Sequence, residues 1–260
     1  MNSAETAAEV GDPACSPRHV VGRVAGITFG AGAQFGFLLT VPFLFRFLRY
    51  GGEGLADRWL FRDALLALQF AVSHSLLLHP ATKRRITRWL PSDLYGCLFA
   101  ACTCVSLALV VGYWKRGAGV LWDLRGVSMI LVLAGFYLSW ISLFYSLWLN
   151  GLGYQTGLIP FLNWMAGRTS RPRALYEAGI YGVLRHPVYL SFLGLIWFTP
   201  RMTWDHVLLT TLWTIYIFVG SHLKDERIAF YVGESYRGYQ ARVPGFPFVP
   251  WGPLARRRVG

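Results

Sequence analysis

The amino-acid sequence predicts an all-α integral membrane protein with about five or six transmembrane helices, including a short C-terminal helical hairpin. The first observation is composition: 54% of the 260 residues are hydrophobic and only 15% are charged, against about 25% charged residues in soluble domains. The second is a mean hydropathy of +0.40. The third is a series of apolar runs separated by short polar loops. These features exclude a disordered chain, a collagen-like chain and a secreted fold held by disulfides.

Four apolar runs in the first 149 residues have about the length needed to cross a bilayer. A hydrocarbon core about 30 Å thick takes about 20 residues of helix. The second run is the shortest and carries a histidine and two serines, and Pro42 in the first run predicts a kink without ending the helix. The predicted spans are Ile27–Phe47, Ala64–His79, Tyr95–Trp114 and Gly126–Leu149.

Two shorter apolar runs follow and predict the hairpin, Val188–Thr199 and Val207–Ser221. Between them, Thr203 is suited to cap the second helix and Asp205 to favour its positive end. The predicted organisation is therefore a disordered tail over residues 1–19, a four-span membrane region over 20–149, and a catalytic region over 150–260. That last region holds the hairpin at 188–221 and a cytosolic helical tail. Cys15 lies in the tail and the other three cysteines lie in span three, so we expect no disulfide and no zinc site.

The basic residues indicate how the chain sits in the membrane. The net charge is +12, and with six spans, 17 of the 25 Lys and Arg residues fall on the face that holds both termini. The positive-inside rule then places both termini in the cytoplasm, and we expect a multi-pass protein of a bacterial inner membrane. The lipid bilayer is the expected partner of the basic loop between spans two and three, and no nucleic acid is expected.

Two motifs in the C-terminal half carry candidate functional residues. The first is Gly179-Ile-Tyr181-Gly-Val-Leu-Arg185-His186-Pro187-Val-Tyr189, directly before the hairpin. It also suits a membrane-interface cap, with proline at the first helical position and arginine and tyrosine at the headgroups. The second follows the hairpin: the adjacent acids Asp225 and Glu226, then Gly233, Tyr236 and Tyr239. A solvated amphipathic tail with charge pairs four residues apart is the alternative interpretation.

As an ordered pair around a hairpin, these motifs resemble the isoprenylcysteine carboxyl methyltransferase superfamily, which includes phospholipid N-methyltransferases. The matching part covers residues 179–248. The whole-chain layout, with the pair His74-Ser75 in span two, is most similar to the bacterial methanethiol S-methyltransferase branch. The resemblance implies a membrane enzyme that uses S-adenosylmethionine as cofactor and methylates a small lipophilic acceptor.

The resemblance also implies roles for individual residues. His186, Pro187 and Tyr189 would frame the adenine, with Tyr181 in the same motif. Asp225 and Glu226 would lie near the ribose or amino group, Arg185 near the carboxylate, and Tyr236 and Tyr239 would close the site. Two positions depart from the family pattern: Ser191 replaces a glycine, and Lys224 with Asp225 stands where a Glu-Glu pair is usual.

The remaining candidates concern the methyl acceptor. A thiol reacts as its thiolate, and His74 is the candidate base because an ionisable residue within a span is a functional hypothesis by default. Hydrogen bonding between helices is the alternative role for His74. Tyr145 at the end of span four, and Tyr154 and Gln155 in the glycine-rich loop after it, are the predicted substrate-binding residues. That loop suits either a substrate gate or a plain turn.

The predicted function is therefore methyl transfer to a small thiol, with methanethiol giving dimethyl sulfide. Methylation of an isoprenylcysteine carboxylate or a phospholipid amine is the first alternative, and an NADPH-dependent sterol or enone reductase is the second. We expect neither a metal nor an obligate protein partner.

Overall fold

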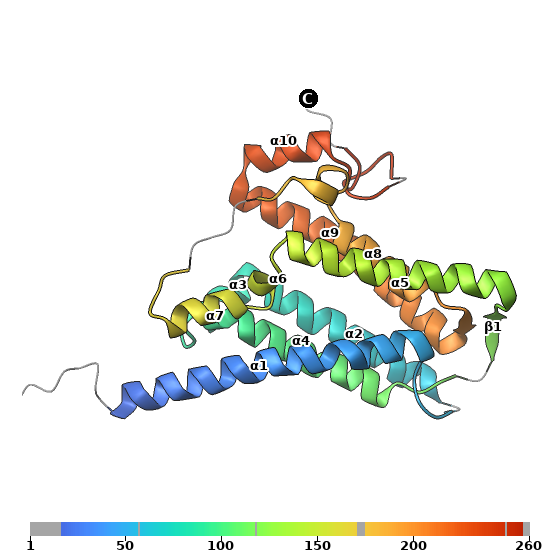
Figure 1. The fold of residues 1–260 in the computed structure, drawn as a ribbon, viewed down its shortest axis with the longest axis horizontal. Helices are drawn as coiled ribbons and strands as arrows, with labels where there is room; N and C mark the ends of the chain where they lie inside the picture. Colours follow the sequence, from blue (N-terminus) through green and yellow to red (C-terminus); the bar gives the residue numbers. More distant parts are fainter. Residues whose placement is uncertain (1–16, 57, 118, 171–174, 248, 257–260) are drawn as a thin grey trace, which may run out of the picture.

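The structure is a computed structural model that describes residues 17–56, 58–117, 119–170, 175–247 and 249–256, with the side chains of residues 17–20 left aside. The described part is helical apart from one pair of short strands (Figure 1). Its first half comprises α1 (Pro17–Tyr50), α2 (Trp59–Leu78), α3 (Pro80–Ile86), η2 (Ser92–Leu94), α4 (Tyr95–Tyr113), β1 (Val120–Asp123) and α5 (Gly126–Leu149). Its second half comprises α6 (Leu152–Gln155), α7 (Leu158–Met165), η3 (Gly179–Gly182), α8 (Pro187–Trp197), β2 (Arg201–Thr203), α9 (Trp204–Val232) and α10 (Glu234–Arg242).

Five of the described helices are long and apolar enough to cross a membrane: α1, α2, α4, α5 and α9. Many of their large apolar side chains are exposed, such as Phe35, Leu131 and Ile215. Exposed apolar surface of this extent is stable in lipid and costly in water. The prediction of an all-α multi-pass membrane protein is therefore confirmed.

The sequence-based boundaries need correction at several ends. Residues 1–16, which include Cys15, lie outside the described residues, whereas residues 17–19, assigned above to the tail, belong to α1. Helix α1 continues through Pro42, as expected. Helix α2 begins at Trp59, earlier than predicted, because Asp63 is buried beside its neighbour Arg62 and so does not interrupt the helix (Arg62 Nε to Asp63 Oδ1, 2.9 Å).

The hairpin consists of one short helix and one long one. Helix α8 has 11 residues, which span about 16 Å at 1.5 Å per residue, so it cannot cross a bilayer core alone. Helix α9 has 29 residues and runs past the predicted end at Ser221 to Val232. The charged residues after Ser221 predict an earlier end, but no glycine or proline interrupts the chain from Leu223 until Gly233.

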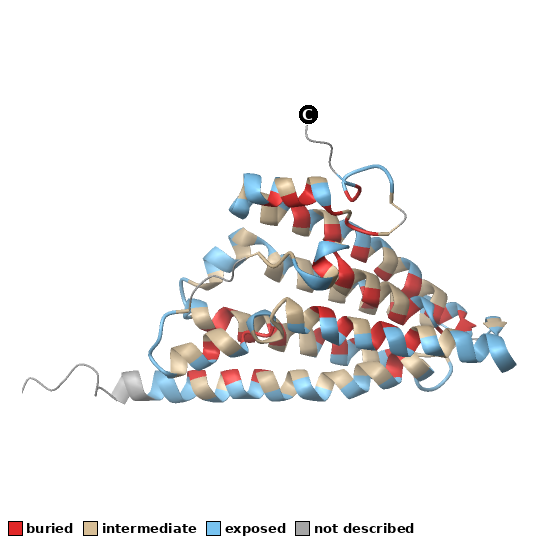
Figure 2. Cartoon of the chain, turned by 45° about the horizontal axis from the view of Figure 1, so that its top comes forward, coloured by how far each residue is buried: buried red, intermediate tan, exposed pale blue. Residues whose placement is uncertain are grey.

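The buried residues, shown in Figure 2, form one main core and two smaller clusters. Helix α1 lies on α4, α2 lies between α4 and α9, and α5 lies on α8. The core combines residues from all six of these helices with two from the C-terminal segment, Phe246 and Leu254. The C-terminal segment is thus packed on the membrane helices, which places α10 beside the start of α8.

One end of the bundle is closed by the short antiparallel sheet, in which Val120 of β1 pairs with Thr203 of β2. Thr203 is the residue before α9, as expected, but its side chain makes no capping hydrogen bond. Asp205 instead is buried and accepts hydrogen bonds from Trp114 Nε1 and Gly117 N, both at 3.0 Å. These bonds join the α4–α5 connection to the first turn of α9 at the end of the bundle away from α10.

Candidate active site

The α8–α9 hairpin brings the two sequence motifs together. Pro187 is the first residue of α8, a position where its missing N–H costs no hydrogen bond. Helix α8 runs antiparallel to α9, so that Trp197 Nε1 donates to Thr214 Oγ1 near one end (3.0 Å). Near the other end, His186 lies beside Asp225. Motifs that are 40 residues apart in sequence therefore meet at the start of α8.

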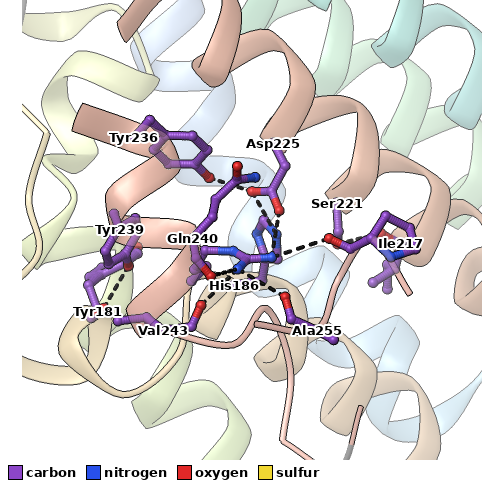
Figure 3. A network of polar contacts seen from close by, with 12 residues as sticks. Tyr181, His186, Ile217, Ser221, Asp225, Tyr236, Tyr239, Gln240, Val243 and Ala255 are labelled. Carbon is purple, nitrogen blue, oxygen red and sulfur yellow. Dashed lines mark hydrogen bonds and ion pairs between the residues drawn. The ribbon is translucent and has the colours of Figure 1, made fainter. Parts of the chain in front are cut away.

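Asp225 is the centre of a buried polar network, shown in Figure 3. Arg185 Nη2 donates to Asp225 Oδ2 at 2.9 Å, and His186 Nε2 lies 3.1 Å from Oδ1. The Tyr236 hydroxyl from α10 also donates to Oδ1. All four side chains are buried. Opposite charges buried together compensate the loss of hydration, so the carboxylate and guanidinium depend on each other.

Arg185 also fastens the C-terminal segment to the start of α8. Besides Asp225, its Nη atoms donate to backbone carbonyls of that segment, and its own N–H donates to Pro244 O at 2.9 Å. Gly245 allows this approach, because a Cβ there would lie 2.7 Å from Leu254 O and 3.1 Å from a His186 ring carbon. The carbonyls that accept from Arg185 are those of Gln240, Val243, Pro253 and Ala255.

The tyrosines of α10 extend the same buried network. Tyr239 Oη donates to Tyr181 O at 2.6 Å, and Tyr181 Oη donates to Ser146 O at the end of α5 at 3.1 Å. Burial, and then the negative charge of Asp225, raise the pKa of Tyr236, so its hydroxyl stays protonated as a donor. Tyr181, Tyr236 and Tyr239 therefore hold α10 against α5 and α9.

Several buried polar atoms around Asp225 have no hydrogen-bond partner among the residues that the structure describes. They are Arg185 Nε, the ring nitrogens of His186, whose contact with Asp225 is poorly directed, and both amide atoms of Gln240, whose side chain is fully buried. Gln240 lies next to the network in Figure 3. Unpaired buried donors and acceptors are uncommon and call for a ligand or water. Together they fit a ligand whose edge carries both donors and acceptors.

His186 makes protein stability depend on pH. Burial lowers its pKa from 6.5, against the opposing effect of Asp225, so the folded protein holds it neutral. Below pH 6.5 the unfolded chain then binds a proton that the folded protein does not bind. The contribution of His186 to stability is therefore complete above pH 6.5 and is lost as the pH falls below it. We expect a loss of up to about 1.4 kcal/mol per pH unit over that interval.

The test compares thermal unfolding midpoints at about pH 7.5 and about pH 5.5. His186→Gln should reduce the difference between the two midpoints, whereas the exposed His79→Gln should retain the wild-type difference. An unchanged difference in His186→Gln would contradict the neutral buried imidazole.

A cavity of about 260 Å³ lies next to this network, between the end of α2, α3, α8 and α9. Tyr189 separates the two: its ring is edge-on to His186 at 5.5 Å on one side, and the Lys224 Nζ lies 5.3 Å above it on the other. Arg227 Nη1 donates to Leu78 O at 3.2 Å, at the carbonyl end of α2. The lining residues are Ser75, Leu78, His79, Pro80, Tyr189, Tyr216, Gly220, Leu223, Lys224, Arg227 and Phe230.

The structure brings most of the predicted cofactor residues into one place, but not all predicted site residues. Glu226 is exposed, unlike its neighbour Asp225. Tyr145, Tyr154 and Gln155 are exposed at the α5–α6 end and do not line the cavity.

His74 does not line the cavity either. Its Nδ1 is 3.3 Å from the Thr103 hydroxyl, and its ring contacts Tyr216, whose own ring faces the cavity. His74 is therefore one residue removed from the cavity surface, behind Tyr216.

Sequence reasoning considered Lys224 and Arg227 together only as a phosphate clamp for the alternative NADPH reductase, and it missed Gln240. Lys224 was noted as a departure from the family pattern, and Arg227 received no role in methyl transfer. The spacing of Tyr216, Gly220, Leu223 and Arg227, at three or four residues, was the available signal, because such residues share one face of a helix. In the described part of the chain, no three His, Cys, Asp or Glu side chains are placed to hold a metal ion.

Comparison with known proteins places the chain among methyltransferases. A methanethiol S-methyltransferase of Pseudomonas sp. (strain GM41(2012)) is 30% identical over 232 residues, covering 85% of this chain and 89% of that enzyme. A second, from Crocosphaera subtropica, is 26% identical over 239 residues, covering 87% and 93%. Nurim of Rattus norvegicus is 28% identical over 240 residues, covering 82% and 90%.

No family model and no solved structure matches the chain. The similarity nevertheless extends over about nine tenths of the length of each of these relatives. The chain belongs to the methanethiol S-methyltransferase family, within the isoprenylcysteine methyltransferase-like superfamily, and is a membrane methyltransferase.

Proposed function

We propose that the methyl donor is S-adenosylmethionine and that the acceptor is a small lipophilic thiol, methanethiol giving dimethyl sulfide. The observation that supports this most is the position of the cavity. It lies against the tyrosine of the Arg-His-Pro-x-Tyr motif and against α9, and it is lined largely by apolar and aromatic side chains. A small apolar acceptor partitions into such a space, and methyl transfer needs alignment and a dry site, without a metal or a covalent enzyme intermediate.

The residues present fit S-adenosylmethionine. The unpaired atoms of His186 and Gln240 supply the donor and acceptor groups that an adenine edge requires. Tyr189 lies between the network and the cavity, at the boundary where donor and acceptor would meet. When bound, the donor supplies a methyl group on a positively charged sulfur.

Arg185 and Asp225 then have positioning roles in this proposal. Their charges are paired with each other, unlike the atoms of His186 and Gln240, which leaves neither charge available to the donor. They hold His186 and Tyr189 at the start of α8 and fasten α10 above them. Glu226, on the exposed face of α9, remains a proposed direct contact for the donor's amino group.

The proposed location is a bacterial inner membrane with both termini in the cytoplasm. Lys83, Arg84, Arg85 and Arg88 are exposed in and after α3, at the end of the bundle that holds the cavity. Clustered basic residues favour the cytoplasmic leaflet and its anionic headgroups. The donor would then enter from the cytoplasm and the acceptor from the bilayer or the cytoplasm.

The proposed function is tested with purified protein in nanodiscs, isotopically labelled S-adenosylmethionine and a panel of acceptors. The panel holds methanethiol, longer alkyl thiols, an isoprenylcysteine and a phospholipid amine, with products read by mass spectrometry. We expect labelled dimethyl sulfide from methanethiol, and saturable binding of S-adenosylhomocysteine by calorimetry. Folded protein that binds no S-adenosylhomocysteine would refute the proposed donor, and transfer to the other acceptors but not to thiols would refute the proposed acceptor.

A matched pair of tyrosine variants locates the reaction. Tyr189→Ala is expected to lower kcat/KM for methanethiol by about 100-fold, the size of the loss when reacting groups are displaced by about 1 Å. Tyr231→Ala removes an exposed ring from the same helix bundle outside the cavity, and should leave the rate within about two-fold. Equal rates for the two variants would exclude the cavity as the place of transfer.

A further inference from the structure

The cavity beside Tyr189 carries an unbalanced positive charge. Lys224 and Arg227 lie three residues apart on the same face of α9, and both line the cavity. No aspartate or glutamate is among the lining residues. Asp225 lies between them in sequence but on another face, where Arg185, His186 and Tyr236 surround its carboxylate. The cavity therefore presents two cations to whatever occupies it.

Both cations are held in place without a carboxylate partner among the described residues. The ammonium group of Lys224 lies over the Tyr189 ring at 5.3 Å, a cation–π contact that orients the group without neutralising its charge. Arg227 donates one N–H to Leu78 O, which uses part of its five-donor guanidinium. A cation in a partly desolvated apolar space stabilises an anion far more than it would in water.

We propose that Lys224 and Arg227 form an anion subsite that binds the methyl acceptor as its thiolate. The inference rests on the proposed function and adds to it the form in which the acceptor binds and the residues that select it. A thiol is a weak nucleophile and its thiolate a strong one, so two fixed positive charges supply the reactive form at neutral pH.

The reaction at this subsite balances as a direct displacement. The thiol proton passes to bulk water as the thiolate binds. The thiolate sulfur then attacks the methyl carbon, a carbon–sulfur bond forms, and the bond between that carbon and the sulfonium breaks with its electron pair going to the sulfonium sulfur. The products are a neutral thioether and a neutral donor sulfur. A neutral thioether has no attraction for Lys224 and Arg227, which favours its release.

The carboxylate of the methyl donor has the same anionic chemistry, and the experiment separates the two sources. Lys224→Met removes the charge and keeps an unbranched side chain, Lys224→Arg restores the charge, and Lys83→Met is the matched control. Lys83 is an exposed lysine whose Nζ also lies over a tyrosine ring, that of Tyr95 at 5.6 Å, outside the cavity. Each variant is assayed with an alkyl thiol and with a more acidic aromatic thiol, and S-adenosylhomocysteine binding is measured in parallel.

We expect Lys224→Met to lower kcat/KM for the alkyl thiol at about pH 7 by about 100-fold, the loss typical when one fixed donor to a negative charge is removed. The loss should be below about 10-fold for the aromatic thiol, which ionises unaided, and for the alkyl thiol it should shrink as pH rises towards the pKa of that free thiol. Lys224→Arg should recover most of the rate, Lys83→Met should match wild type, and S-adenosylhomocysteine affinity should change by less than about three-fold.

Several titratable or charged groups face Lys224 and can contribute to the pH dependence of the rate. They are Tyr189 from α8, His79 at the end of α2, and Tyr216, Arg227 and the adjacent Asp225 on α9. Equal losses for both thiols at every pH would overturn the proposal. Loss of S-adenosylhomocysteine affinity by more than about 10-fold would overturn it in favour of the donor carboxylate. A pH dependence abolished by His74→Gln and retained in Lys224→Met would overturn it in favour of His74 as the base. If wild type transfers methyl groups to no thiol, the proposed function fails instead.

Discussion

Replacing Asp225 by asparagine is expected to lower the free energy of unfolding by about 3–5 kcal/mol and to abolish methyl transfer. The substitution retains the shape of the side chain and removes its charge. Arg185 would then remain buried with no negative partner, since its other acceptors are neutral carbonyls. Leaving one ion of a buried pair uncompensated is among the costliest single changes in a protein.

The adjacent Glu226→Gln is the matched control for stability. It removes the same charge one residue later, on an exposed part of α9, and is expected to change stability by less than about 1 kcal/mol. The unfolding midpoint of each variant is measured in detergent, by size-exclusion chromatography of samples heated to increasing temperatures. Similar midpoints for Asp225→Asn and wild type would show that the network does not hold the α8–α10 corner together.

Gly157→Ala is expected to lower the free energy of unfolding by at least about 2 kcal/mol. Gly157 precedes α7 with φ of +77°, a conformation that costs residues with a Cβ about 1–2 kcal/mol. It also packs directly on the start of α4: a Cβ at the facing Gly96 would lie 2.5 Å from Gly157 Cα, and one at Gly157 would overlap backbone atoms of Gly96 and Cys97. A backbone contact cannot be relieved by turning a side chain, so α7 and α4 must separate.

That separation would also break the hydrogen bond from Gln34 Nε2 to Thr156 O, 2.9 Å long. Gly167→Ala is the control, because Gly167 has φ of +66° and nothing within 4 Å of its Cβ position. Gly167→Ala should lower the free energy of unfolding only by the cost of the left-handed conformation, about 1 kcal/mol. Unfolding midpoints that fall equally in the two variants would show that the contact with Gly96 contributes nothing.

The Gly157 contact also bears on the loop that follows α5. Its glycines suited either a substrate gate or a plain turn, and spacing alone could not separate the two. In the structure, Thr156 and Gly157 are buried against α1 and α4, while Tyr154 and Gln155 are exposed. One end of the loop is therefore anchored, and a role in binding the acceptor stays a prediction for Tyr154 and Gln155.

The helical spans were predictable because hydropathy is a local property. Each of the four N-terminal runs became a helix, and Pro42 did not end α1. The predicted ends failed at Asp63 and at Lys224–Arg227, where a charge in the sequence suggested a boundary. In each case the folded structure supplies a partner or a cavity for the charged side chain, so the helix continues through it.

The candidate site, too, was predictable from the sequence only in part. The ordered motifs identified the segments that meet at the start of α8, and composition identified the membrane class. The sequence presented Asp225 and Glu226 as an equivalent pair and Lys224 as an isolated departure. The structure separates them: Asp225 is buried with Arg185, Glu226 is exposed, and Lys224 faces the cavity.

The sequence by itself therefore determined the fold class, the membrane spans and the superfamily, because apolar runs and ordered motifs are read along the chain. Only the tertiary structure decided which charges are paired and which face a cavity. The reason is geometric: successive residues of a helix point about 100° apart, so neighbours in sequence enter different environments. Which environment each one enters depends on α8, α10 and the C-terminal segment. Arg185 joins these parts, and it bonds to Asp225 of α9 and to a residue 70 positions further along the chain.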